Sequence, residues 1–239
     1  MDRQHRLGVN QIVYIQRAEN EYSLVRFRSM DDMRRELASH GVYIGRDVSI
    51  GREALIADGV HIGAGSVIGP EATLERGCRL GEHCRIDQDA FVGRYTQLGN
   101  GVHLGVSSEI GRYGVVGPEA DIQNRCILHD NVHVGPGCVL RDDTQIGSQS
   151  VIGHSVALAA GTCAGRMVHM APAAYTSTSV VIPSCSRLEA RSSLVVRDTV
   201  LAGFRPRIPV WPVQLGGTTQ IPESELTLST PDVRRTMVL

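Results

Sequence analysis

Apolar residues recur at every sixth position along the middle of this chain. From Ile44 to Cys163, twenty blocks of six follow one another without an insertion, and each begins with isoleucine, leucine or valine. The fifth position of nearly every block holds a small side chain, as at Val48, Ala54 and Cys78. A short strand with this pattern cannot bury its apolar side alone, so neighbouring blocks must stack. The pattern predicts a solenoid of short parallel strands.

A second period of eighteen residues is superimposed on the first. If three blocks form one coil, residues eighteen apart stack at the strand spacing of about 4.8 Å. Glycine permits a left-handed backbone or the close approach of another chain, so we expect its column to serve turn geometry, packing or a ligand groove. The unbroken column consists of Gly45, Gly63, Gly81, Gly99, Gly117, Gly135 and Gly153.

The segment that precedes the repeat, residues 1–43, predicts a small α/β cap. Residues 11–16 and 22–28 alternate or run apolar, as short strands do. Ser29, with an acidic residue three positions later, begins a predicted helix over residues 30–39. These elements would cover the open edge of the first coil.

The solenoid is predicted to span residues 44–202 as a β-helix of about 8 coils. Its pattern weakens over residues 164–181 but keeps its phase, so we expect the coils to continue there with a local bulge. Residues 203–239 carry five prolines. Proline excludes a long helix, so this part is predicted to be an extended strap packed on the prism.

Composition narrows the possible partners and the redox chemistry. The net charge of -1 argues against a general nucleic-acid surface. The sequence has no run of eighteen apolar residues and no basic-then-apolar N-terminus, so we expect a cytoplasmic protein without a membrane span. Four cysteines fall on the small inward position of their blocks, which predicts buried thiols instead of disulfides or a metal site. They are Cys78, Cys84, Cys126 and Cys138.

The blocks resemble the hexapeptide repeat of bacterial transferases that fold as a left-handed parallel β-helix. RSSLVVRD over residues 191–198 and AGFRPR over residues 202–207 look like the closing motif of sugar acetyltransferases. The resemblance implies a homotrimer with active sites between neighbouring prisms. It also implies transfer of an acyl group from acyl coenzyme A to an amine or hydroxyl of a small, sugar-type substrate. Arg205 and Arg207 carry over as candidate coenzyme A contacts.

A second resemblance points to gamma-class carbonic anhydrases, which share this fold. DIQNRCILH over residues 121–129 and IGHSVALAA over residues 152–160 look like histidine-bearing motifs of that family. Ala159 stands where the last histidine ligand would be, so we expect no metal, although metal-dependent hydration stays open as a third hypothesis.

Acyl transfer needs a general base, most often a histidine, which contributes about 10²–10⁴ to the rate. His103 has the best neighbours, because Arg85 and Asp121 lie eighteen residues to either side and would flank it on adjacent strands. A carboxylate beside an imidazole fixes its tautomer and supports its protonated form. His103 and Asp121 are therefore candidate catalytic residues, with a solvated charge ladder as the alternative.

Two further histidines remain candidates. His129, followed by Asp130, resembles the His-Asp catalytic block of the transferases, one position earlier in its hexapeptide. His154 occupies the matching third position, but Ser155 replaces the aspartate.

A column of three arginines at one corner is the candidate phosphate site. Arg76, Arg94 and Arg112 are eighteen apart, and Tyr95 and Tyr113 follow two of them. Like charges at about 4.8 Å repel by on the order of 1 kcal/mol per pair in water, and a bound anion would relieve that cost. Arginine with aromatic rings suits the phosphates of coenzyme A, and solvated corner arginines are the alternative.

Taken together, the sequence favours an acyltransferase, with acetyl coenzyme A as the expected donor and no nucleic-acid partner. A non-catalytic trimeric scaffold or regulatory subunit stays open, because the repeat contains no long catalytic loop before residue 164.

Overall fold

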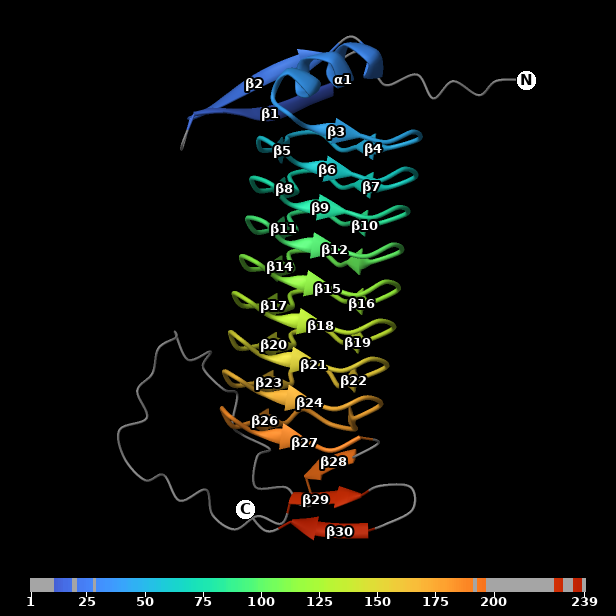
Figure 1. The fold of residues 1–239 in the computed structure, drawn as a ribbon, viewed down its shortest axis with the longest axis vertical. Helices are drawn as coiled ribbons and strands as arrows, with labels where there is room; N and C mark the ends of the chain where they lie inside the picture. Colours follow the sequence, from blue (N-terminus) through green and yellow to red (C-terminus); the bar gives the residue numbers. More distant parts are fainter. Residues whose placement is uncertain are drawn as a thin grey trace, which may run out of the picture.

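The computed structural model shows a parallel β-solenoid of about 8 turns with one short helix at its N-terminal end (Figure 1). Successive strands pass to the next of three sheets, so that each sheet receives one strand per coil. The described residues are 11–18, 21–27, 29–190, 193–196, 226–229 and 234–237.

A hairpin and a helix precede the first coil. β1 (Gln11–Ala18) and β2 (Glu21–Phe27) pair antiparallel, and β1 also pairs in parallel with β5 of the first coil. α1 (Met30–Ser39) begins where sequence analysis places it, because Ser29 Oγ accepts a hydrogen bond from the Asp32 backbone N–H at 3.1 Å. No helix in the described part of the chain is long and apolar enough to cross a bilayer.

The three sheets form the three faces of a prism, which we call faces A, B and C. Face A continues from the hairpin through β5 (Ala54–Ile56), β8 (Thr73–Leu74), β11 (Phe91–Val92), β14 (Glu109–Ile110), β17 (Ile127–Leu128), β20 (Gln145–Ile146), β23 (Cys163–Ala164) and β26 (Val181–Ile182). Face B contains β3 (Tyr43–Ile44), β6 (His61–Ile62), β9 (Arg79–Leu80), β12 (Gln97–Leu98), β15 (Val115–Val116), β18 (His133–Val134), β21 (Val151–Ile152), β24 (His169–Met170) and β27 (Arg187–Leu188).

Face C contains β4 (Ser49–Ile50), β7 (Val67–Ile68), β10 (Arg85–Ile86), β13 (His103–Leu104), β16 (Asp121–Ile122), β19 (Val139–Leu140), β22 (Ala157–Leu158), β25 (Tyr175–Thr176) and β28 (Ser193–Val196). Antiparallel β29 (Leu226–Ser229) and β30 (Arg234–Met237) extend this face beyond β28. In each two-residue strand the first side chain points outward and the second points into the core.

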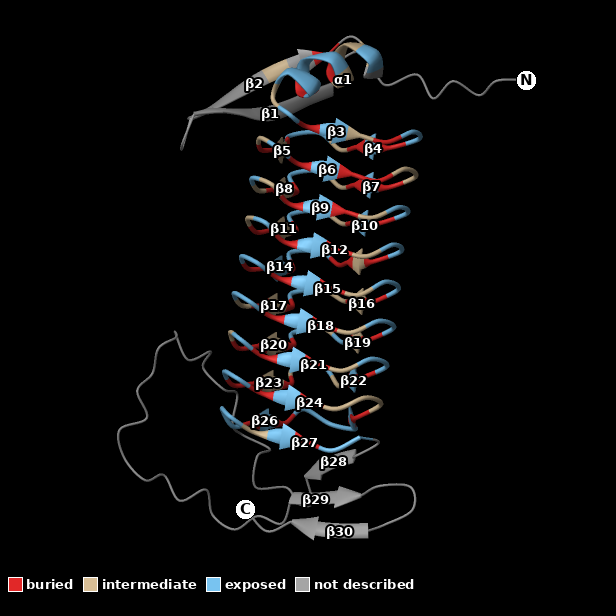
Figure 2. Ribbon diagram, viewed as in Figure 1, coloured by how far each residue is buried: buried red, intermediate tan, exposed pale blue. Residues whose placement is uncertain are grey.

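The prism interior is filled by the first and fifth residues of the blocks (Figure 2). Ile86, Leu104 and Ile122, stacked behind face C, are 0% exposed. The four inward cysteines are free and buried, as the sequence predicts, and burial raises the pKa of Cys78 to about 12. The Cys138 thiol lies 2.9 Å from a carbonyl oxygen of the next coil, so these thiols are neutral packing groups.

Close packing of successive coils explains the glycine column. A Cβ at Gly135 would lie 2.6 Å from Gly153 C in the next coil, and the glycines of this column do not have positive φ. The positive φ values fall instead at the corners, many of them at non-glycine residues such as Asp47 and Tyr95. The column therefore serves the stacking of coils and not turn geometry.

Strands continue through the weakened part of the repeat, from β23 to β26. The register is least regular at β25, where only Tyr175 pairs with β22 and the Thr176 hydroxyl accepts a hydrogen bond from the Ala159 N–H at 2.7 Å. The domain boundaries at residues 43 and 202 stay predictions, and most of the proline-rich tail lies outside the described residues.

Candidate functional site

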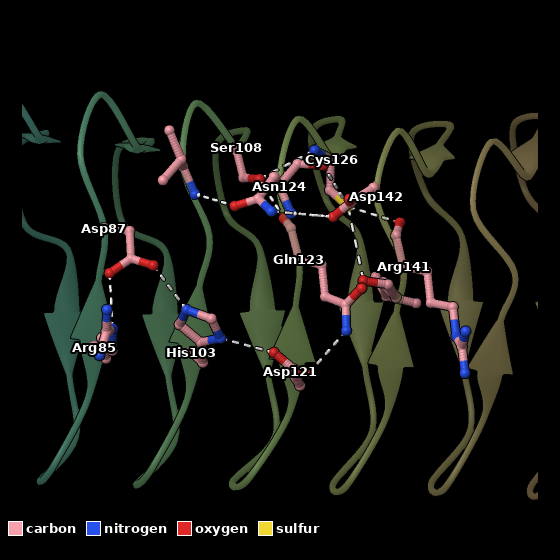
Figure 3. A network of polar contacts seen from close by, with 12 residues as sticks. Arg85, Asp87, His103, Ser108, Asp121, Gln123, Asn124, Cys126, Arg141 and Asp142 are labelled. Carbon is pink, nitrogen blue, oxygen red and sulfur yellow. Dashed lines mark hydrogen bonds and ion pairs between the residues drawn. The ribbon is translucent and has the colours of Figure 1, made fainter.

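The register of face C brings the predicted charged column together. Arg85 pairs with His103 across β10 and β13, and His103 pairs with Asp121 across β13 and β16. Asp87 lies two residues after Arg85, and Gln123 lies two residues after Asp121, where the side chain of an extended chain points to the same side again. We call these five residues the His103 cluster (Figure 3).

Both ring nitrogens of His103 contact a carboxylate. Nδ1 lies 2.7 Å from Asp121 Oδ1, and Nε2 lies 2.9 Å from Asp87 Oδ2. The other oxygen of Asp87 accepts a hydrogen bond of 2.8 Å from Arg85 Nε. Gln123 Nε2 donates a longer one of 3.4 Å to Asp121 Oδ2. The imidazole is therefore fixed in place from both sides.

The charges of the cluster favour a protonated ring. Partial burial opposes the charged form, but the hydrogen bonds to Asp87 and Asp121 outweigh it and raise the pKa of His103 above its ordinary value. For Asp87, burial also opposes the charge, and the hydrogen bonds from His103 and Arg85 lower its pKa. His103 thus acts as a donor to two carboxylates until it loses its proton.

The cluster is concentrated on three neighbouring coils and is open to solvent. The His103 side chain is 37% exposed, Asp121 38% and Asp87 20%. The backbone ladder of face C forms without these side chains, since uncharged residues occupy the same outward position on other coils. Those residues are Ser49, Val67, Val139, Ala157 and Tyr175.

The second predicted histidine has a different setting. His129 follows β17 on face A and is half-buried. The Asp130 carboxylate next to it accepts a hydrogen bond from the Arg112 backbone N–H at 2.7 Å. Asp130 therefore caps a corner of the preceding coil, which is a structural role for the acid of the His-Asp pair.

His154 is exposed at the corner between faces B and C. Its Nδ1 lies 3.4 Å from Ser155 Oγ, so a hydroxyl stands beside the ring where His103 has a carboxylate. Its neighbours eighteen residues away are Pro136 and Pro172, which offer no N–H donor. The face C register does not bring His129 or His154 into the His103 cluster.

The arginine column lies at the corner between faces A and B. Arg76 Nη2 lies 3.4 Å from Asp58 Oδ2, and Arg94 Nε lies 3.3 Å from Glu75 Oε2. These carboxylates therefore relieve part of the predicted repulsion between the arginines. Because this corner is opposite face C, the column and the His103 cluster lie across the prism from each other.

Aromatic rings accompany the arginine column. Tyr95 and Tyr113 stack with their centroids 5.5 Å apart and an interplanar angle of 17°. Both rings are about half exposed, at 47% and 54%. Arg205 and Arg207, the other candidate coenzyme A contacts, lie outside the described residues.

Asp87 and Gln123 belong to the cluster but are not among the candidate catalytic residues. The sequence places both on the outward strand faces of Arg85 and Asp121, two residues further along, and the structure shows that Asp87 contacts the His103 ring. Within the described residues, no group of three histidine, cysteine, aspartate or glutamate side chains is arranged to hold a metal ion.

Comparisons with known proteins agree with the coil geometry. Three stretches match the family described as bacterial transferase hexapeptide (six repeats). They are residues 41–76 and 53–88, which overlap, and residues 125–160. A comparison with curated protein sequences finds no match.

Two solved structures illustrate the likeness. UDP-N-acetylglucosamine O-acyltransferase from Moraxella catarrhalis is 16% identical, with a TM-score of 0.58 over 65% of this chain and 67% of that one. A mutant of perosamine N-acetyltransferase from Caulobacter crescentus, in complex with CoA and GDP-perosamine, is 25% identical, with a TM-score of 0.39 over 44% and 50%. This chain thus spans half the length of the second protein. The matched repeats and the stacked coils together show that the chain is similar to the bacterial transferase hexapeptide family over residues 41–88 and 125–160.

Proposed function

We propose that this protein transfers an acyl group from acyl coenzyme A to an amine or hydroxyl of a small, sugar-type acceptor, with His103 as the general base. The observation that carries the proposal is the imidazole fixed between Asp87 and Asp121 on an open sheet face. The hexapeptide-repeat fold supports it, because transferases of this kind act on such substrates. Acyl transfer without a covalent enzyme intermediate requires little more than a base, a bound thioester and an aligned acceptor.

The two carboxylates have different roles in this reaction. Asp121 accepts the Nδ1 hydrogen and so leaves Nε2 as the nitrogen that takes a proton. Nε2 faces Asp87, whose contact must open when the acceptor binds. The acceptor N or O atom then bonds to the thioester carbonyl carbon and its proton passes to Nε2. The carbon–sulfur bond breaks, and the proton moves to the coenzyme A thiolate.

The coenzyme A site is proposed to lie between copies of the chain. Arg76, Arg94 and Arg112 are on the corner opposite face C, so they would serve the His103 cluster of a neighbouring copy. This arrangement fits the homotrimer that the family resemblance implies. Arg205 and Arg207 remain proposed contacts for the same donor.

A pH profile tests the role of His103. Only the neutral imidazole accepts a proton, so kcat/KM for acetyl coenzyme A turnover should rise with pH. Its midpoint should lie above about 6.5, the ordinary histidine value, because both carboxylates raise the pKa of His103. In D121N one carboxylate is lost, so the midpoint should move to lower pH and the maximal rate should fall. Coenzyme A release, measured with a thiol reagent between pH 5 and 9, follows both changes.

An unshifted midpoint in D121N would remove His103 from the role of base. Absence of coenzyme A release with every acceptor tested, in a correctly folded protein, would favour the non-catalytic scaffold. The uninterrupted strands from β3 to β27 are the observation that favours this second function.

A further inference from the structure

The Asp87 carboxylate and the His103 ring face each other, and a hydrogen bond on the opposite side of each group holds it in place. Asp87 Oδ2 and His103 Nε2 are 2.9 Å apart. On the far side of the carboxylate, Arg85 Nε holds Asp87 Oδ1 at 2.8 Å, and on the far side of the ring, Asp121 holds Nδ1 at 2.7 Å. Once His103 has lost its proton, two hydrogen-bond acceptors face each other across one gap.

A nitrogen nucleophile satisfies such a pair, and an oxygen nucleophile does not. A primary amine has two N–H groups and can donate to Asp87 and to His103 at the same time. A hydroxyl has a single hydrogen, so it leaves one of the two acceptors without a donor, which is costly at a partly buried carboxylate. We propose that Asp87 makes this site selective for an amino group, which binds between Asp87 Oδ2 and His103 Nε2.

The charge of the cluster points to the same ligand. With His103 neutral, Asp87 and Asp121 outnumber Arg85 and leave one net negative charge, which attracts an ammonium ion and repels an anion. Arg85 is 68% exposed, so its guanidinium can follow Asp87 as the pair opens to admit the nitrogen. The inference rests on the proposed function, because it takes Nε2 as the atom that receives the proton.

The test measures binding at His103 directly. Glucosamine and glucose, which differ by one amino group, are titrated against the full-length protein at constant ionic strength, above the midpoint of the pH profile. The imidazole nitrogen resonances of His103, assigned by their loss in H103Q, report occupancy. Glucosamine should shift them at a concentration about tenfold lower than glucose, the effect of one additional hydrogen bond to a charged group. In D87N the two sugars should act at nearly equal concentrations.

D143N is the matched control, because Asp143 also accepts a hydrogen bond of 2.8 Å from an arginine, Arg125, without contacting an imidazole. It should keep the preference for glucosamine. Equal responses to the two sugars in the natural protein, no response to either, or a preference that survives D87N would each overturn the inference. Acetyl transfer without a preference for amines would refute the inference alone. A glucosamine-specific shift without transfer would refute only the proposed function.

Discussion

H103Q should lose about 10²–10⁴ in kcat/KM for acyl transfer, because the glutamine side chain hydrogen-bonds but does not accept a proton at neutral pH. The loss should be in kcat as well as in kcat/KM, since the base acts in the transition state. His103 is partly exposed, so thermal unfolding should change little; exposed ion pairs contribute about 0–1 kcal/mol. Coenzyme A release and the melting temperature, measured on the same preparation, separate the two effects.

H133Q provides the matched control for this loss. His133 begins β18 on face B and is exposed, so it makes the same change on the outer surface of another sheet. We expect its activity to stay within about twofold of the natural protein. H129Q and H154Q test the remaining candidates. A loss of about 10²–10⁴ in H129Q or H154Q, with H103Q still active, would transfer the role of base to that residue.

Leu104→Ala should destabilise the solenoid by about 2–5 kcal/mol, the cost of removing a fully buried leucine side chain and leaving a cavity. Leu104 is 0% exposed and lies directly behind His103 on β13, between Ile86 and Ile122 of the adjacent coils. Each coil contacts only its neighbours, so the coils on either side should lose protection first. Urea unfolding gives the free energy, and amide hydrogen exchange locates the weakened coils.

Val106→Ala is the control two residues away. Val106 is 41% exposed at the corner after β13, so its substitution should change the unfolding free energy by no more than about 0.5 kcal/mol. Equal destabilisation by the two variants would contradict the assignment of Leu104 to the core of the prism.

The eighteen-residue period of the sequence predicts much of the candidate site. It places Arg85, His103 and Asp121 on adjacent strands, and the observed register has this order. The sequence also places Asp87 on this outward face, two residues after Arg85, but not its contact with His103. Asp87 reaches the Nε2 atom of His103 diagonally, and side-chain conformations decide such a contact.

The arginine column shows the limit of the same reasoning. Spacing alone leaves Arg76 and Arg94 either as part of a phosphate site or as solvated corner charges. Their carboxylate partners, Asp58 and Glu75, come from the preceding coil, and long flexible side chains choose such partners only when the corners are built. That this corner lies opposite face C likewise follows only from the arrangement of the three sheets in space.

By itself the sequence determined the period, the inward and outward residues, the buried cysteines and the columns of side chains, because in a solenoid these depend only on contacts between neighbouring coils. It also determined the start of α1, because the Ser29 cap is a local contact. The tertiary structure decided that His103 contacts two carboxylates, that Asp130 caps a corner, and that the glycine column serves close stacking. These features depend on side-chain conformations and on distances between backbones, which a one-dimensional repeat leaves undefined until the coils are packed.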